Sequence, residues 1–233
     1  MHGISMDKRL LTCASLCKGE HIADIGTDHG YLPCYMIKNG MCSSALACDV
    51  APLPLESARQ HIREQGLEDK ITPLLSDGLE NVPPQGITDI VIAGMGGELI
   101  ADILKKCQWI KNKDNPINLV LQPMTKWDVL RKWLYENGFT VTKEKACEEG
   151  RFVYSVMQAV YTGEKPPYEC DLRYLYCGLV TADYDDGALY IERQAARLFA
   201  AGKGMMKNPE KARLGEEMLE LSKKLTENKK LLP

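Results

Sequence analysis

Acidic residues and glycines recur where predicted strands end, and residues of these types in this pattern suit the binding of a nucleoside. The first group is Asp24 and Gly26, in the segment ADIGTDHGYLP at 23–33. Gly26 lets the backbone approach a ligand closely, because glycine has no Cβ. The next glycine is Gly30, so the G-x-G-x-x-G pattern that cradles a pyrophosphate is incomplete. This strand end therefore suits a ligand without a pyrophosphate.

Two further carboxylates follow the second and third predicted strands. The spacing from Asp24 to Asp49 is close to the roughly 20 residues at which an acid binds ribose hydroxyls, and a carboxylate can accept both hydroxyl hydrogen bonds. Asp77 could accept from an adenine amino group, although Asp-Gly is also a common turn. These acids indicate S-adenosylmethionine, a nucleoside with a charged amino-acid tail. The predicted cofactor-binding residues are Asp24, Gly26, Thr27, Asp49, Val50, Asp77, Gly78, Ala93, Gly94 and Met95.

The fourth predicted strand ends in glycines that leave room for a ligand, and the fifth ends near an amide side chain. The glycine-rich exit reads A-G-M-G-G at 93–97, and its glycines leave room for a ligand or a base. Gln122, near the end of the fifth strand, could read a base edge. The sequence lacks the Asn/Asp-Pro-Pro-Tyr motif of exocyclic amino methyltransferases, which argues against methylation of an exocyclic amine by that scheme.

A parallel sheet is needed to bring these strand ends together, and apolar runs that alternate with amphipathic segments predict one. We expect strands at 21–26, 43–50, 71–78, 86–97 and 117–124. We expect helices at 6–17, 31–40, 53–66, 98–107 and 127–139. Segments 139–146 and 151–161 have no helix between them, which predicts a terminal antiparallel hairpin. The fold class is therefore α/β, a Rossmann-like class I methyltransferase sheet with helices on both faces.

The remainder of the chain predicts a helical appendage. Residues 162–187 look loop-rich, and a helical pattern begins at 188 and breaks at 201–209. The apolar stripes before and after the break are Ile191, Ala195 and Leu198, then Leu214, Met218, Leu221 and Leu225. This spacing predicts an antiparallel, coiled-coil-like helical pair. We therefore divide the chain into a catalytic domain at 1–162 and a linker with a C-terminal helical domain at 163–233.

The net charge of −3 conceals an asymmetry along the chain. Residues 188–233 hold ten basic and six acidic side chains, a balance of +4, so the rest of the chain carries −7. A basic helical appendage on an acidic domain is compatible with binding a polyanion, and equally with an ordinary solvated helix face.

The cysteines and the N-terminus indicate the compartment. None of the nine cysteines forms a C-x-x-C pair, so neither a zinc ribbon nor a redox motif is indicated, and we expect reduced, buried thiols. The first residues lack the long apolar stretch of a signal peptide. No apolar run approaches the roughly 18 residues that a membrane span needs. We expect a soluble, cytoplasmic protein with no bound metal.

Three segments, ADIGTDHGYLP, IAGMGGELIADIL and LVLQP followed by LRKWLYENGF, carry a resemblance. Over nearly the whole chain, the sequence resembles the bacterial tRNA (adenine-22-N1)-methyltransferase family. The resemblance implies transfer of a methyl group from S-adenosylmethionine to N1 of an adenosine in the D-loop of tRNA, and a helical C-terminal domain. Gly30 stands where alanine is common in the family, and Met124 where asparagine is common.

With adenine N1 as the target, Asp28 and Tyr31 become the predicted catalytic residues. Asp28 could hydrogen-bond the adenine amino group and help take up a proton, and Tyr31 could orient or stack the base. The expected partner is tRNA rather than DNA or a membrane, and we expect a monomer. Two alternatives remain open: a small-molecule methyltransferase on the same fold, and a non-enzymatic RNA-binding protein with a cofactor-sized pocket.

Overall fold

Seven strands form one mixed sheet in the order β3-β2-β1-β4-β5-β7-β6, in a computed structural model that describes residues 6–227. The parallel strands are β1 (His21–Ile25), β2 (Ser44–Asp49), β3 (Ile71–Leu75), β4 (Asp89–Gly96) and β5 (Asn118–Thr125). The last two strands are β6 (Phe139–Glu149) and β7 (Phe152–Tyr161). β7 runs antiparallel to both β5 and β6. The prediction of five parallel strands and a terminal antiparallel hairpin is confirmed.

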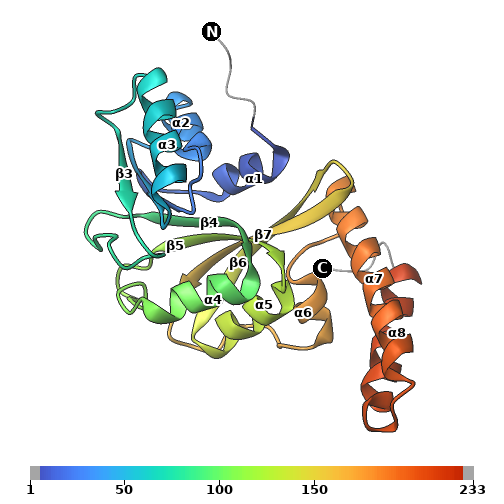
Figure 1. Cartoon of the computed structure of the whole chain (residues 1–233). Helices are drawn as coiled ribbons and strands as arrows, with labels where there is room; N and C mark the ends of the chain where they lie inside the picture. Colours follow the sequence, from blue (N-terminus) through green and yellow to red (C-terminus); the bar gives the residue numbers. More distant parts are fainter. Residues whose placement is uncertain (1–5, 228–233) are drawn as a thin grey trace.

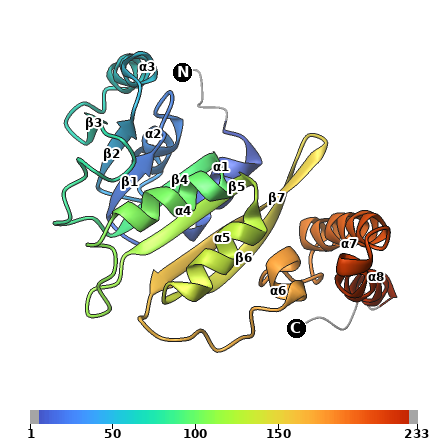
Figure 2. The same cartoon turned by 60° about the horizontal axis from the view of Figure 1, so that its bottom comes forward.

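Helices cover both faces of the sheet, as predicted (Figures 1 and 2). One face carries α1 (Lys8–Leu16), α2 (Tyr31–Lys38) and α3 (Pro52–Glu64). The other carries α4 (Gly97–Lys106) and α5 (Trp127–Glu136). The alternation of side chains along β4 builds both layers: Ile90 and Ile92 pack with α4 and α5, whereas Val91 packs with α1 and α2. Within residues 6–227, no helix is long and apolar enough to cross a membrane.

The C-terminal part begins earlier than the sequence predicted. Its elements are α6 (Leu172–Cys177), α7 (Asp185–Met205), the 3-10 turn η1 (Pro209–Lys211) and α8 (Ala212–Glu227). The expectation of a loop-rich 162–187 was therefore wrong for α6 and for the start of α7. Asp171 caps α6 by accepting a hydrogen bond from the backbone N of Tyr174 at 2.8 Å. Figure 1 shows α7 and α8 side by side, projecting from one end of the sheet.

The glycines of the tail allow helix crossing instead of ending the helix. α7 continues through Gly202, where an added Cβ would lie 2.8 Å from the carbonyl oxygen of Gly215 on α8. The two helices therefore approach too closely for a side chain at that point. The expected break at 201–209 was placed too early, because α7 ends only at Met205.

The pairing face of α8 differs by one residue from the predicted stripe. Met218 and Leu225 are buried as expected, but Leu214 is exposed and Gly215 takes its place in the interface. The hydroxyl of Ser222 donates to the carbonyl of Ala195 at 2.8 Å. This contact joins the second half of α8 to the middle of α7, so the pair is antiparallel, as predicted.

Burial makes the thiols weak acids. Seven of the nine cysteines are buried and two are half-buried, and all nine are free thiols. Burial raises the pKa of Cys48 to about 12 and that of Cys147 to about 11. Since the thiolate is the reactive form, these cysteines act as small apolar side chains of the core.

A fully buried ion pair fixes the helical part to the sheet. Arg131 Nη2 on α5 lies 2.5 Å from Glu144 Oε1 on β6, and neither side chain is exposed. The same Nη2 donates to the hydroxyl of Tyr190 on α7 at 2.9 Å, and Nη1 donates to the carbonyl of Leu175 on α6 at 2.7 Å. Glu144 Oε2 accepts from the backbone N of Leu179 at 2.9 Å. One ion pair therefore links α5, β6, α6 and α7.

We expect Glu144→Gln to lower the free energy of unfolding by about 3–5 kcal/mol, because Arg131 would keep an uncompensated buried charge. The matched control is Glu136→Gln, which removes an exposed pair with Lys132 at 3.8 Å and should change stability by less than about 1 kcal/mol. Urea unfolding measures both variants. A loss for Glu144→Gln no larger than that for the control would contradict the structural role of the pair.

Candidate functional site

The carboxyl ends of β1, β2 and β3 are tied together at one edge of the sheet. The backbone N atoms of Gly26 and Thr27, after β1, both donate to the carbonyl of Cys48 in β2, at 2.8 and 2.9 Å. The backbone N of Ser76, after β3, donates to the carbonyl of Asp49 at 2.9 Å. The segments around Asp24, Asp49 and Asp77 therefore meet at one edge of the sheet, where ligands of open α/β sheets bind.

Asp24 is a buried carboxylate in the floor of this site. The hydroxyl of Thr27 donates to Asp24 Oδ2 at 2.7 Å. Burial raises the pKa of Asp24 to about 6, although the hydrogen bond from Thr27 and the positive charge of Arg9 act in the opposite direction. A buried carboxylate of this kind favours a positively charged ligand, because a nearby cation stabilises its ionised form.

Asp49 ends β2 with its two oxygens oriented by the neighbouring backbone. Oδ1 accepts from the N of Ala51 at 2.9 Å, and Oδ2 lies 3.4 Å from the N of Asp28. The next residue, Val50, is an apolar side chain with 64% of its surface exposed. A carboxylate beside an exposed apolar surface matches a sugar with hydroxyl groups joined to a flat ring.

The exit of β4 lies directly against the exit of β1. An added Cβ on Gly26 would come within 2.4 Å of Met95 Cε, and Gly26 also has a φ of +75°. The left-handed backbone favours glycine at this position, and the absence of a Cβ lets the Met95 methyl group pack there. Gly94 has a φ of +83°, and its backbone N donates to Gln122 Oε1 on β5 at 3.0 Å. Met95 therefore lies against the turn after β1, and Ala93 and Gly94 directly precede it at the exit of β4.

Gln122 supports the site from inside and presents no free amide to a base. It is fully buried, and its Oε1 accepts from Gly94 and also from Arg9 Nη1 at 2.9 Å. Its Nε2 donates to the carbonyl of Pro123 at 3.1 Å. The sequence left open whether Gln122 reads a base edge, and in this structure neighbouring groups occupy both ends of its amide.

Arg9 is a residue of this site that sequence reasoning missed. Its Nη2 pairs at 3.0 Å with Asp7, which caps α1 by accepting from the N of Leu10 at 2.7 Å. A Cβ added to Gly94 would lie 3.6 Å from Arg9 Nη1, so the guanidinium lies next to the β4 exit. The sequence signal for Asp7 is its place before a helix, but nothing local links Arg9 to Gln122.

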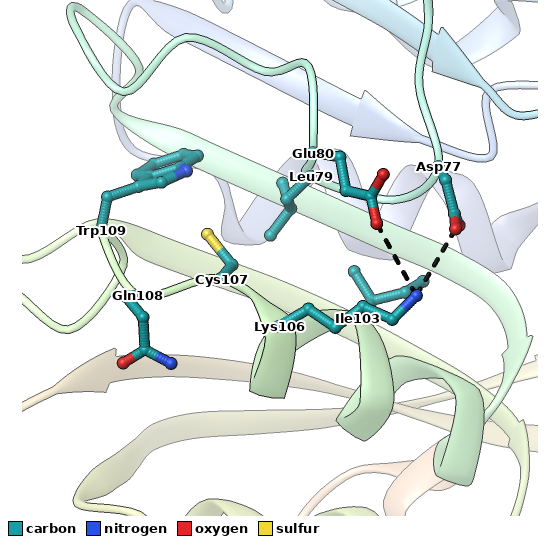
Figure 3. Close-up of a pocket in the computed structure, with 8 residues that line it drawn as sticks. All are labelled: Asp77, Leu79, Glu80, Ile103, Lys106, Cys107, Gln108 and Trp109. Carbon is teal, nitrogen blue, oxygen red and sulfur yellow. Dashed lines mark hydrogen bonds and ion pairs between the residues drawn. The ribbon is translucent and has the colours of Figure 1, made fainter.

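Asp77 lines a hollow of about 270 Å³ between the loop after β3 and the C-terminal end of α4 (Figure 3). Lys106 Nζ on α4 is 3.5 Å from Asp77 Oδ2 and 3.8 Å from Glu80 Oε1. Gly78 has a φ of +57°, and a Cβ there would lie 2.8 Å from a methyl carbon of Ile103. The loop after β3 therefore packs closely on α4, and Asp77 pairs with a lysine whose side chain is more than half exposed.

Asp28 and Tyr31 occupy the loop after β1 and the start of α2. Asp28 has a left-handed backbone with φ of 52°, and its Oδ2 lies 3.6 Å from His29 Nε2. The ring of Tyr31 lies 5.3 Å from that of His29 and meets the ring of His61 edge-on at 5.0 Å. The structure thus brings Asp28 to Asp49, and it places a partly exposed Tyr31 on the side of the site next to α3.

The raised pKa of Asp24 predicts a pH-dependent stability difference. Its pKa is ordinarily 3.8 but about 6 in the folded protein, so the folded state loses stability as pH rises through that interval. Asp24→Asn keeps an acceptor for Thr27 and removes the titration. Relative to wild type, the variant should gain about 3 kcal/mol in free energy of unfolding between pH 4 and pH 7. Urea unfolding across this range measures the gain.

The exposed Asp102 on α4 provides the matched control, because Asp102→Asn should produce no such pH-dependent gain. A difference between Asp24→Asn and wild type that stays constant with pH would contradict the burial argument.

Comparison with known proteins identifies the fold and the family. A family model described as a methyltransferase domain matches residues 6–157. The tRNA (adenine(22)-N(1))-methyltransferase of Bacillus subtilis is 37% identical over 161 residues, which cover 68% of this chain and 66%, just under two thirds, of that enzyme.

Two crystal structures resemble the chain over nearly its whole length. The B. subtilis M1A22 tRNA methyltransferase TrmK is 28% identical with a TM-score of 0.78, covering 96% of this chain and 99% of that one. Sp1610 of Streptococcus pneumoniae, in complex with S-adenosyl-L-methionine, is 28% identical with a TM-score of 0.79, covering 95% of this chain and 99% of that one. The chain therefore belongs to the methyltransferase domain family, and it is similar in sequence and fold to bacterial tRNA (adenine-22-N1)-methyltransferases.

Proposed function

We propose that this protein transfers the methyl group of S-adenosylmethionine to N1 of adenosine 22 in the D-loop of tRNA. The observation that carries the proposal is that Asp24, Gly26, Asp49 and Gly94 meet at one sheet edge, in a chain of this family. No feature of the described residues specifically favours a small-molecule substrate, whereas the basic tail favours a polyanion.

The residues at this edge fit S-adenosylmethionine. Asp49 is oriented to accept the ribose hydroxyls, exposed Val50 flanks the adenine, and buried Asp24 favours the cationic amino-acid end. Asp77 accepts from the adenine amino group once Lys106 gives way. Gly26, with a φ of +75° and no Cβ, lets the turn after β1 lie close to Met95. We assign Thr27, Gly78, Ala93, Gly94 and Met95 to the same site.

When bound, the cofactor supplies a methyl group on a positively charged sulfur atom. The residues of the chain must expose the target base, align its N1 with that methyl group and stabilise the product. Attack by the N1 lone pair leaves a positive charge on the methylated adenine. The carboxylate of Asp28, on the exposed loop after β1, stabilises this charge and accepts from the amino group. Tyr31 orients the base with a ring already held by His29 and His61.

The division of labour between the two parts of the chain follows from their charges. We assign catalysis to residues 1–162 and tRNA binding to residues 163–233, since the acidic part holds the cofactor motifs and the tail 188–233 carries +4. Lys229 and Lys230 contribute to that charge but lie outside the described residues. All the residues assigned to the site lie in a single chain, which supports action as a monomer. The similarity to a tRNA methyltransferase supports tRNA as the substrate rather than DNA. The nine free thiols support the cytoplasm as its location.

The direct test is methyl transfer to an unmodified tRNA transcript with labelled cofactor. We expect the nucleoside digest to contain labelled N1-methyladenosine. Asp28→Asn, which keeps the left-handed backbone accessible, should lower the single-turnover rate by about 10²-fold, and Tyr31→Phe should also lower it. Cofactor affinity should stay within about twofold of wild type in both variants, because neither side chain is assigned to cofactor binding.

The control is Asp102→Asn, an exposed substitution on α4 that should leave the rate unchanged. Label on no RNA, or only on the exocyclic amine, would refute the proposed reaction. Wild-type rates in both Asp28→Asn and Tyr31→Phe would refute only the catalytic assignments.

A further inference from the structure

A groove lies between β7 and α7, beside the exit of β5. Two adjoining hollows of about 410 and 370 Å³ share Phe152, Val153 and Arg197. Each volume lies in the range of ligand pockets, roughly 300–1,000 Å³. The first hollow also reaches Pro123 and Met124 at the end of β5. Figures 1 and 2 both show the outer end of the β6–β7 hairpin beside α7.

One end of the groove adjoins the proposed methyl-transfer site. Met95 at the exit of β4 pairs with Pro123 of β5, and Gly96 pairs with Thr125. Neighbouring strands lie about 5 Å apart, so the groove begins one strand away from the β4 exit. A polymer that presents one residue to the site can therefore extend its next residue into the groove.

Three arginines give the groove an unbalanced positive charge. Arg151 lies at the start of the hairpin's return strand, and Arg193 and Arg197 lie one turn apart on α7. Among the residues that the structure describes, none of the three lies within 4.0 Å of a carboxylate oxygen. In contrast, Arg213 on α8 pairs with Glu217 at 3.2 Å. The uncompensated arginines of the helical pair thus face the sheet.

Aromatic rings alternate with these arginines. The guanidinium carbon of Arg151 lies 4.9 Å from the ring centre of Phe152, and that of Arg197 lies 4.5 Å from the ring centre of Trp127. Phe152 is half exposed, and the Nε1 of Trp127 is buried without a hydrogen-bond partner in the described part of the chain. Arginines bind phosphates, and exposed rings stack on bases of any sequence.

We propose that this groove binds the nucleotide adjacent to the target adenosine, with its phosphate on Arg193 and Arg197 and its base against Phe152. The inference rests on the proposed function and adds the path by which the RNA strand reaches the site. An acidic peptide would use the arginines but leave the exposed ring of Phe152 without a role, so the combination favours a single-stranded nucleotide. The proposed RNA contact then extends from residues 163–233 across the junction with the sheet to Phe152 on β7.

The test measures binding of the full-length protein to a fluorescently labelled, unmodified tRNA transcript at several salt concentrations. Arg193→Gln/Arg197→Gln should weaken binding about tenfold or more, and should lower the slope of log affinity against log salt by about one for each arginine. Phe152→Ala should weaken binding about tenfold with an unchanged salt slope. Cofactor affinity should stay at its wild-type value in every variant, and the unfolding midpoint should stay at its wild-type value in Arg193→Gln and Phe152→Ala.

The matched control is Arg213→Gln, which removes the same charge from the outer helix and should change affinity by less than about twofold. Arg193→Gln alone is also measured, because Arg197 contacts Trp127 and its loss could disturb packing. Wild-type affinity and slope in both Arg193→Gln and the double variant would overturn the proposal. Equal losses in Arg213→Gln and Arg193→Gln would also overturn it, since charge alone would then explain binding.

Binding and methyl transfer are read separately, so the two proposals can fail separately. Groove variants that bind the tRNA and methylate it like wild type would refute the proposed role of the groove and leave the proposed reaction unaffected. A wild-type protein that binds RNA through these residues but transfers no methyl group would refute the reaction alone. A wild-type protein that does not bind the transcript would refute both.

Discussion

The buried ion pair between Arg131 and Glu144 is the constraint on which the arrangement of the two parts depends. Although Arg131 Nε has no hydrogen-bond partner among the described residues, the cost of taking both charges out of water is offset by hydrogen bonds to the Arg131 Nη atoms and the Glu144 oxygens. The groups that satisfy them come from α6, α7 and the segment between these helices, through Leu175, Leu179 and Tyr190. The start of α7 is therefore fixed relative to the sheet. This contact therefore also positions Arg193 and Arg197, which lie one and two turns after Tyr190 on α7 and line the groove.

A second set of contacts fixes the shape of the proposed cofactor site and lowers the stability of the folded protein. Asp24 is buried with a pKa raised to about 6, and Gly26 holds a left-handed backbone with a φ of +75° against Met95. Gln122 accepts hydrogen bonds from both Arg9 and the backbone N of Gly94, so residues distant in sequence support the glycine-rich exit of β4. Binding sites commonly retain such unfavourable features, because a preorganised site binds its ligand more tightly.

Much of the fold was predictable because its signals are local. Strands that end in glycine or aspartate alternate with amphipathic helices, and parallel strands align their carboxyl ends, so Asp24, Asp49 and Gly94 had to meet at one edge. What could not be predicted depends on contacts between distant segments. The role of Gln122 could not be read from the sequence because its partner Arg9 lies on the first helix. The first residues of the break expected at 201–209 are instead a close helix crossing at Gly202.

The central claim is that the sheet edge and the groove together deliver one particular adenosine for methylation at N1. Methylation at N1 blocks the Watson–Crick edge of adenine, so a reverse transcriptase stops at the modified nucleotide. Primer extension along a tRNA transcript, after treatment with the protein and S-adenosylmethionine, tests this claim most directly. We expect one new stop, immediately 3′ of position 22, that disappears when the transcript carries guanosine at position 22. A stop at another adenosine, or no stop, would contradict it.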